Sequence, residues 1–365
     1  MWQRDGRAVK ETVLVAGFAT RHVARSARRA GYRVCAVDHF CDLDLGWIVS
    51  DYEGFFELTD LPAAIEEIQL RNSIDHLVLT SGAESAICPG IPRAGTCPEV
   101  IRPFLDKAAT QLFFSRLAVS HPAIAGADDY PVMIKPVCGA GGWRNVIVRT
   151  EEQKKTWIAE FDLPYICQQF VEGLPASVSC ISDGRRAVAI AANEQILRGS
   201  GDSAFGFAGS ITPCDHPLAG EMMAIAERIV AASGCIGSVG VDFVLSDEAV
   251  AIEVNPRFQA TLDTVEGSTG ANLFSLHMDA CSGRLPLERP QPIRYSARRI
   301  LFAGKDCIVR SRLDRFSAFT ADIPHPGTEF TEGDAIISVF GYGASRDDAL
   351  RMLDNHISLI RQYLE

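Results

Sequence analysis

Residues 237–259, which read GSVGVDFVLSDEAVAIEVNPRFQ, predict a β-hairpin. Apolar residues dominate both arms, and the polar residues 246–248 between the arms predict the turn. Asp242 lies on the first arm, and Glu253 and Asn255 lie on the second. Residues two apart on a strand share a face, and neighbours across a hairpin meet. We therefore expect these three side chains to gather at one point.

Carboxylate and amide oxygens are suitable ligands for Mg²⁺, which usually binds one or two carboxylates together with substrate phosphates. Arg257, two residues after Asn255, is well placed to bind an anion beside such a metal. The alternative is an acidic hairpin edge on which Arg257 is only a surface charge. The hairpin predicts a metal site if the rest of the chain supplies a phosphate site.

The composition predicts a globular protein with a low affinity for polyanions. The chain has 365 residues, of which 47% are hydrophobic and 22% are charged, enough for about two or three domains. Its net charge of −11 argues against nucleic acid or an anionic membrane as a partner, because both need a basic face. The sequence contains no signal-peptide pattern and no run of about eighteen apolar residues. We expect a soluble cytoplasmic protein.

Eleven cysteines are scattered along the chain, and several lie in apolar segments, as Cys167 and Cys180 do. This distribution is typical of buried, reduced thiols and not of a disulfide framework. Cys35 and Cys41, with His39 between them, lack the second ligand pair that a structural zinc site needs. We expect no zinc.

The N-terminal part predicts a strand, a helix and a second strand over residues 12–37. Such a βαβ unit binds dinucleotides when its first turn reads G-x-G-x-x-G, but AGFATRH contributes only Gly17. Asp38, at the end of the second strand, keeps a ribose-binding alternative open. After a third predicted strand, Ser81 and Glu84 are candidates either for a substrate site or for a turn.

A lysine stands inside the apolar strand predicted for residues 130–136, and a buried lysine is costly unless it meets an anion. Three glycines follow Lys135 closely, and their flexible backbone lets N–H groups approach phosphate oxygens: Gly139, Gly141 and Gly142. A plain hairpin turn is the alternative. A strand lysine directly before a glycine loop favours a phosphate site.

Further segments predict scaffold elements. The strand at residues 164–170 offers an edge at 168–171 where backbone groups could recognise adenine, and residues 205–213 read as a glycine-rich loop. Residues 267–270 predict a turn before a helix whose first N–H groups could meet an anion. The last helix is the clearest, with a capping box from Ser345 to Asp348.

Five segments occur in an order that resembles the ATP-grasp superfamily: FLDKAATQLFF (104–114), VMIKPVCGAGG (132–142), QQFVEG (168–173), GVDFVL (240–245) and AIEVNPRF (251–258). The resemblance runs from about Val13 to the last helix. It implies an α/β fold, α+β in the ATP-binding part. The implied domains are a Rossmann-like N-terminal domain at 1–102, an ATP-grasp domain at 103–290 with a lid subdomain at about 125–175, and a C-terminal mixed αβ region at 291–365.

The same resemblance implies roles for individual residues. Lys107 and Lys135 would bind ATP phosphates, and the three glycines of 139–142 would form the phosphate lid. The adenine hinge would comprise Gln168, Gln169, Phe170, Val171 and Glu172. The ligands of Mg²⁺, or Mn²⁺, would be Asp242, Glu253 and Asn255, with Arg257 and Lys135 as the catalytic pair. One departure is Pro175, which stands where the family often has a ribose-binding Glu, so Glu172 or a backbone group is left for that contact.

The reaction that the resemblance implies is the ATP-dependent activation of a carboxylate as an acylphosphate, which an amine then attacks to release ADP and phosphate. Positioning and charge neutralisation carry such chemistry, so the absence of an obvious nucleophile triad is expected, and His277 and His325 are interpreted as structural. Small carboxylate and amine substrates are the expected partners, and a homodimer is left open. Within the superfamily the chain resembles a branch that includes archaeal tyramine-glutamate ligase. The alternatives are a bicarbonate-using carboxylase or carbamoyl-phosphate enzyme, and a nucleotide-binding protein without turnover.

Overall fold

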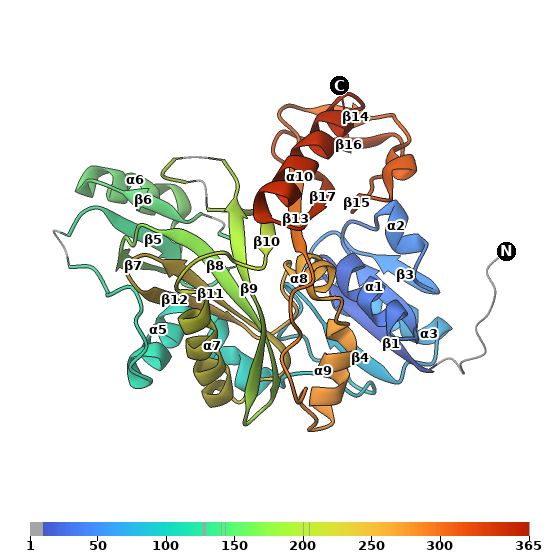
Figure 1. The fold of residues 1–365 in the computed structure, drawn as a ribbon, viewed down its shortest axis with the longest axis horizontal. Helices are drawn as coiled ribbons and strands as arrows, with labels where there is room; N and C mark the ends of the chain where they lie inside the picture. Colours follow the sequence, from blue (N-terminus) through green and yellow to red (C-terminus); the bar gives the residue numbers. More distant parts are fainter. Residues whose placement is uncertain are drawn as a thin grey trace.

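The computed structural model describes residues 10–126, 129–139, 141–142, 144–199, 201–203 and 205–364. Figure 1 shows three regions: the N-terminal sheet at one side, a small lobe carrying α6 and β5–β7 at the other, and long strands between them. The C-terminal helix α10 and strand β17 lie above the centre of this view. The predicted α/β class, with an α+β part, is confirmed. The N-terminal sheet and the sheet of the small lobe lie on opposite sides of the long central strands.

The N-terminal sheet is parallel, with strand order β3-β2-β1-β4. Its elements confirm the predicted βαβ start: β1 (Lys10–Gly17), α1 (Arg21–Arg29), β2 (Tyr32–Asp38), α2 (Leu43–Gly46), β3 (Asp51–Gly54), α3 (Leu61–Arg71) and β4 (His76–Leu79). Because all four strands run the same way, the loops after β1, β2 and β4 meet at one edge. That edge faces the rest of the molecule.

The small lobe is a three-stranded antiparallel sheet, ordered β6-β5-β7. It comprises β5 (Val132–Pro136), β6 (Val146–Val148) and β7 (Tyr165–Gln169), and α6 (Glu151–Phe161) buries Trp157 against it. Asp106 is extended and its carboxylate accepts hydrogen bonds from the N–H groups of Ala108 and Ala109, so the short helix α4 (Pro98–Ile101) and a 3₁₀ turn (Arg102–Leu105) precede a separate α5 (Lys107–Arg116).

The central sheet has eight strands in the order β12-β11-β8-β9-β10-β13-β17-β15. Their bounds are β8 (Leu174–Asp183), β9 (Ala187–Leu197), β10 (Phe207–Thr212), β11 (Ile236–Leu245), β12 (Ala249–Asn255), β13 (Tyr295–Phe302), β15 (Thr320–Ala321) and β17 (Ala335–Gly343), and the small pair β14 (Cys307–Val309) and β16 (Thr328–Phe330) lies apart. The sheet continues across the predicted boundary near residue 290. The division into three domains stays a prediction.

Helices cover this sheet: α7 (Ala219–Ser233), α8 (Leu262–Thr269), α9 (Leu273–Cys281) and α10 (Arg346–Arg361). The capping box of the last helix is confirmed, since Ser345 accepts a hydrogen bond from the backbone N–H of Asp348. Among the residues that the structure describes, no helix is long and apolar enough to cross a membrane.

Two predicted loops were wrong. Within residues 205–213, β10 pairs with β13, and Gly209 lacks the Cβ that would collide with the carbonyl of Arg298. Residues 267–269 belong to α8, which Gly270 ends in a left-handed conformation. The first three N–H groups of the following helix are not free to bind an anion. Glu266 accepts from Leu273, Ser26 accepts from Phe274, and Asn272 accepts from Ser275.

Candidate functional site

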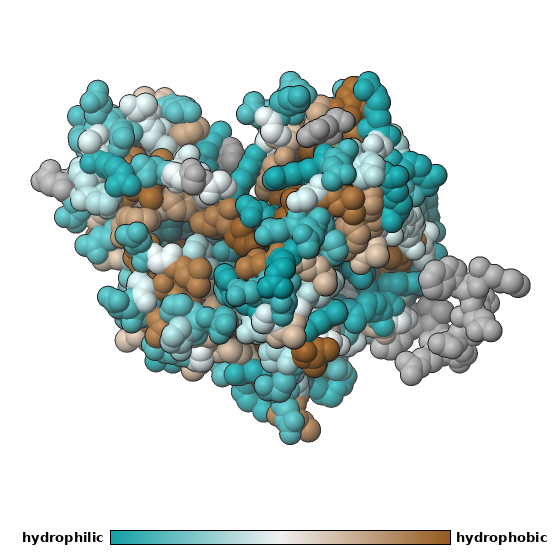
Figure 2. All heavy atoms as spheres, turned by 45° about the horizontal axis from the view of Figure 1, so that its top comes forward, coloured by the Kyte–Doolittle hydropathy of each residue, from teal (hydrophilic) through white to brown (hydrophobic). Residues whose placement is uncertain are grey.

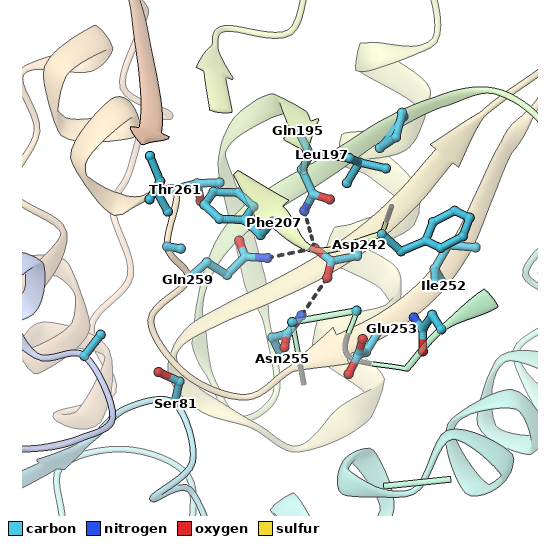
Figure 3. Close-up of a pocket in the computed structure, with 18 of the residues that line it drawn as sticks. Ser81, Gln195, Leu197, Phe207, Asp242, Ile252, Glu253, Asn255, Gln259 and Thr261 are labelled. Atoms are coloured by element: carbon cyan, nitrogen blue, oxygen red, sulfur yellow. Dashed lines mark hydrogen bonds between the residues drawn. The ribbon is translucent and has the colours of Figure 1, made fainter. Parts of the chain in front are cut away.

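The β11–β12 hairpin brings its three predicted ligands together. Asp242 pairs with Glu253 across the two strands, and Asn255 pairs with Gly240. The amide of Asn255 donates to Asp242 Oδ2 at 2.9 Å. Figure 3 shows these side chains projecting into one pocket from neighbouring strands. The hairpin geometry confirms that the two carboxylates and the amide gather at one point.

Two further amides hold Asp242. The side-chain nitrogens of Gln195 and Gln259 donate to Asp242 Oδ1 at 2.9 and 3.2 Å, as the dashed lines in Figure 3 mark. The sequence reasoning missed both residues. Gln259 is the last residue of the segment 237–259 and lies 17 residues from Asp242. Gln195 comes from β9, and only the pairing of strands in the central sheet brings it close to Asp242.

The charges at the hairpin suit a cation. Burial, and then the negative charge of Glu253, raise the pKa of Asp242 to about 7. A bound cation would relieve both effects. In the described part of the chain no cluster of three His, Cys, Asp or Glu side chains could hold a metal. A magnesium ion here would therefore depend on two carboxylates, one amide and phosphate oxygens, which fits the ion's preference; the ligand roles stay a prediction.

Strand β5 buries Lys135, which is 7% exposed. Burial lowers its pKa to about 8, while the charge of Glu253 opposes that shift. Lys107, the first residue of α5, donates from Nζ to the carbonyl of Gly139 at 2.8 Å. A small cavity of about 30 Å³ is lined by both lysines and by Glu253. The structure thus brings the two predicted phosphate lysines to the metal side of the hairpin.

The glycine loop has the backbone that its sequence suggests. The φ values of Gly139, Gly141 and Gly142 are +133°, +69° and +73°, which residues other than glycine rarely adopt. A Cβ on Gly142 would also collide with the backbone carbonyl of Phe205, whereas one on Gly141 would meet nothing. Ala140, between them, lies outside the described residues.

The predicted adenine hinge is divided between two cavities, because successive strand residues point to opposite faces. Gln169, Phe170, Val171 and Glu172 line the large cavity. Gln168 is 5% exposed, lines the small cavity, and donates to Gln111 Oε1 at 3.2 Å. Its own Oε1 has no hydrogen-bond partner among the described residues, so the hinge retains a free buried acceptor on the lysine side.

The large cavity has a volume of about 760 Å³ and lies between the N-terminal edge, the hinge, the hairpin and the C-terminal strands. Figure 2 shows apolar side chains in the hollow between the small lobe and the C-terminal elements. Ser81 lines the cavity, and its role as a substrate-site residue stays a prediction. Glu84 instead forms an ion pair with Arg257, whose Nε lies 2.5 Å from Glu84 Oε1.

Arg257 is fixed by three partners. Besides Glu84, its guanidinium donates to Asn255 Oδ1 at 3.2 Å and to the carbonyl of Phe258 at 3.1 Å. It therefore stands beside the hairpin carboxylates, in the wall of the large cavity. This position suits a group that binds an anion next to a metal-held phosphate.

The ribose-binding alternative for Asp38 is wrong. Asp38 is 1% exposed, and its carboxylate accepts from the N–H and hydroxyl of Thr20 and from the N–H groups of Phe40 and Cys41, at 2.6 to 2.8 Å. These bonds tie the carboxylate to the residue before α1 and to its own loop. It is committed to the N-terminal domain itself.

The two histidines have structural contacts, as interpreted from the sequence. His277 is buried, accepts at Nδ1 from the N–H of Ser238 at 2.9 Å, and lies 3.1 Å from the carbonyl of Ala94 at Nε2. His325 contacts the carbonyl of Cys41 through Nε2 at 3.3 Å.

Residues 104–261 match the family model of the ATP-grasp domain. An uncharacterized protein of Methanocaldococcus jannaschii is 24% identical over 352 residues, which cover 89% of this chain and 87% of that protein. The large chain of carbamoyl phosphate synthase from Pseudomonas syringae is 25% identical over 297 residues, but the match covers 72% of this chain and only 27% of that protein.

Solved structures share the fold across nearly the whole chain. The biotin carboxylase domain of 2-oxoglutarate carboxylase from Hydrogenobacter thermophilus, solved with MgADP and bicarbonate, has a TM-score of 0.76 at 16% identity and covers 96% of this chain and 90% of its own. The L-amino acid ligase of Bacillus licheniformis has a TM-score of 0.71 at 15% identity, covering 96% and 98%. The family match identifies residues 104–261 as an ATP-grasp domain, and these likenesses show that the whole chain shares the fold of the two solved structures.

Proposed function

We propose that the protein is an ATP- and Mg²⁺-dependent ligase that activates a carboxylate as an acylphosphate and joins it to an amine. One observation carries the proposal: the large and the small cavity share Lys135 and Glu253 in their linings, and together they are lined by two lysines, two carboxylates and an arginine. The likeness to an L-amino acid ligase supports the type of reaction. The proposal specifies the acid and the amine as classes of compound and names no individual substrate.

The residues divide the work of phosphoryl transfer. Lys107 and Lys135 bind phosphate oxygens, and the glycine loop covers them with backbone N–H groups. Asp242, Glu253 and Asn255 would hold the Mg²⁺ ion, which would neutralise phosphate charge when bound. Gln195 and Gln259 keep the Asp242 carboxylate in place.

Arg257 and Lys135 act on the reacting groups. Arg257 binds the carboxylate or the phosphoryl group passing to it, and Lys135 neutralises the charge that develops on that group. The carboxylate oxygen attacks the γ-phosphorus and ADP leaves. The unprotonated amine nitrogen then attacks the acyl carbon, phosphate leaves, and the proton that the nitrogen gives up passes to the released phosphate. No side-chain nucleophile takes part.

The test supplies Mg-ATP with mixtures of carboxylic acids and amines and measures nucleotide products. We expect ADP and phosphate that depend on both an acid and an amine; AMP and pyrophosphate would contradict the proposal. Glu253→Gln should lower turnover by at least about a hundredfold, because it removes a metal ligand. Glu248→Gln, in the exposed turn of the same hairpin, is the matched control and should leave turnover unchanged.

A second candidate is a bicarbonate-using carboxylase or carbamoyl-phosphate enzyme. It is favoured by the likeness to a biotin carboxylase domain and to part of carbamoyl phosphate synthase. Because this enzyme would use the same ATP-binding residues, only the dependence of ADP release on the substrate distinguishes it from the ligase. ADP release that requires bicarbonate and no other acid would favour this candidate over the ligase.

The remaining alternative is nucleotide binding without turnover. Glu253→Gln would then change Mg-ATP binding but no product would form with any acid and amine. The biotin carboxylase domain of H. thermophilus was solved as a dimer, and a homodimer of this chain stays an expectation that the molar mass in solution would test.

A further inference from the structure

One wall of the large cavity carries a dense set of charges from three parts of the chain. Arg21, at the start of α1, bonds to Asp263 at 2.6 Å and to Asp322 at 2.8 Å. Arg298, on β13, bonds to Asp322 at 2.8 Å and to the hydroxyl of Ser338. Both side chains are buried, and each guanidinium is paired with at least one of these carboxylates. The charge of each is therefore at least partly neutralised within the wall.

Carboxylates outnumber cations in this wall. Asp44 accepts from the backbone N–H groups of Asp322 and Ile323, which joins α2 to the segment after β15; Figure 1 shows these elements side by side. With Asp42, two positions earlier, four carboxylates face the two guanidinium groups, Arg21 and Arg298, within the described residues. Carboxyl groups therefore outnumber guanidinium groups in this wall, and a bound cation would favour the ionised form of a carboxyl group that lacks a partner.

Asp42 is the carboxylate without a partner. It lines the cavity, and no described residue lies within hydrogen-bond or ion-pair distance of its side chain. Burial, and then the charges of Asp322, Asp44 and Asp38, raise its pKa to about 9, so the free group keeps its proton at neutral pH and a bound cation would favour its ionised form. A metal ion is a poor explanation, because no group of three metal-binding side chains occurs among the described residues.

His22 supplies a second, independent sign of a ligand. It follows Arg21 on α1, is 7% exposed, and lines the same cavity. Neither ring nitrogen has a hydrogen-bond partner among the residues that the structure describes, although a buried polar group normally has one. Burial lowers its pKa to about 4, so the ring is neutral and keeps a nitrogen that can accept a hydrogen bond.

The rim beside these groups is apolar. Phe18, Phe40 and Leu58 line the cavity and are 38%, 44% and 44% exposed. The ring of Phe18 stacks on His39 and meets Phe40 edge to face, which holds both phenylalanines in place. Exposed aromatic faces next to unpaired carboxylate attract an organic cation with an apolar body.

From this arrangement we infer that Asp42 and His22 form the binding site for the ammonium group of an amine substrate, whose apolar body lies against Phe18, Phe40 and Leu58. The inference rests on the proposed ligase function and names the class of its amine. Asp42 pairs with the ammonium charge, and the neutral ring of His22 accepts one of its N–H groups. The same wall disfavours a carboxylate in that position.

The experiment compares three probes of one shape, hexylamine, hexan-1-ol and hexanoate, with the full chain and Mg-ATP analogue, using ligand-observed NMR titration. We expect hexylamine to bind at least tenfold more tightly than either of the other probes. Asp42→Asn should weaken hexylamine about tenfold and hexanol little. Asp354→Asn, an exposed carboxylate on α10, is the matched control and should change neither.

Equal or tighter binding of hexanoate, or hexylamine binding that Asp42→Asn leaves unchanged, would overturn the inference. If the Asp42→Asn protein fails to melt cooperatively, the order of the three probes on the wild-type chain decides alone. A separate Mg-ATP titration keeps the two proposals apart. A chain that binds Mg-ATP but not hexylamine contradicts only this inference, and one that binds no Mg-ATP contradicts the proposed function.

Discussion

Glu84 and Arg257 form an ion pair, Oε1 to Nε at 2.5 Å, that links the edge of the N-terminal sheet to the loop after β12. The two side chains are 10% and 13% exposed. Glu84→Gln leaves the guanidinium partly buried without its counter-charge, so we expect the free energy of unfolding to fall by about 2–3 kcal/mol. Turnover should fall about tenfold because Arg257 is no longer fixed.

Urea denaturation and steady-state kinetics measure the two effects. Glu67→Gln, an exposed carboxylate on α3 in the same domain, is the control and should change neither. An unaltered turnover in Glu84→Gln would show that Asn255 and Phe258 suffice to position Arg257.

We expect Lys135 to lower the free energy of unfolding while contributing to the binding of Mg-ATP. Its pKa is lowered to about 8 by burial, so at pH 7 the folded chain holds a charge that the interior disfavours. Lys135→Met should raise the free energy of unfolding at pH 7 by about 1–2 kcal/mol while abolishing measurable Mg-ATP binding. Chemical denaturation and nucleotide titration test both signs, and exposed Lys305→Met should alter neither.

Gln195 is expected to act through Asp242 and not on the metal directly. Its amide donates to Asp242 Oδ1 at 2.9 Å, so Gln195→Leu frees that carboxylate to turn away. We expect the apparent Kd for Mg²⁺, in the presence of ATP, to rise about tenfold or more. The exposed Gln291→Leu serves as the comparison. A Mg²⁺ affinity equal to that of the wild type would refute this positioning role.

The glycine loop offers a matched pair of substitutions. Gly141 and Gly142 share nearly the same φ, +69° and +73°, so alanine strains the backbone equally at both. Only at Gly142 would the new Cβ collide with the carbonyl of Phe205. We expect Gly142→Ala to raise the KM for ATP several-fold more than Gly141→Ala. Equal effects would mean that backbone conformation alone matters there.

His277 should make stability depend on pH. Burial lowers its pKa from an ordinary value of 6.5 to about 4, so between these pH values the unfolded chain binds a proton that the folded chain does not. Stability is therefore lost as the pH falls, by about 2 kcal/mol at pH 5 relative to pH 8. His277→Gln should remove this part of the pH dependence.

The control for His277 is Phe274→Leu, which perturbs the same packing without a titrating group. It should lower the free energy of unfolding equally at pH 5 and pH 8. If His277→Gln retained the full pH dependence of the wild type, the protonation of His277 would not be the cause.

Local patterns allowed much of this fold to be predicted. The hairpin with Asp242 and Glu253 follows from alternation and a polar turn, and the capped helix at Ser345 follows from its capping box. The strand at 207–212 was missed because its glycines and small residues resemble a loop, and only contact with β13 makes it a strand.

The charged wall of the cavity could not be predicted, because its parts are far apart in the chain. Arg21 and Asp322 are separated by 301 residues and Asp44 and Ile323 by 279, so no local pattern relates them. Gln195 was missed for the same reason. What sequence reasoning finds are groups within one hairpin or one loop, whereas groups that meet through sheet order require the structure.

The carboxylate of Asp38 has a consequence for the whole N-terminal domain. It accepts from the N–H of Thr20, the residue before α1, at the helix end where nucleotide-binding βαβ domains receive a phosphate. A tethered anion acts at an effective concentration far above that of any free nucleotide. The N-terminal domain thus already carries an anion at this helix terminus, so a nucleotide phosphate would have to displace Asp38 to bind there.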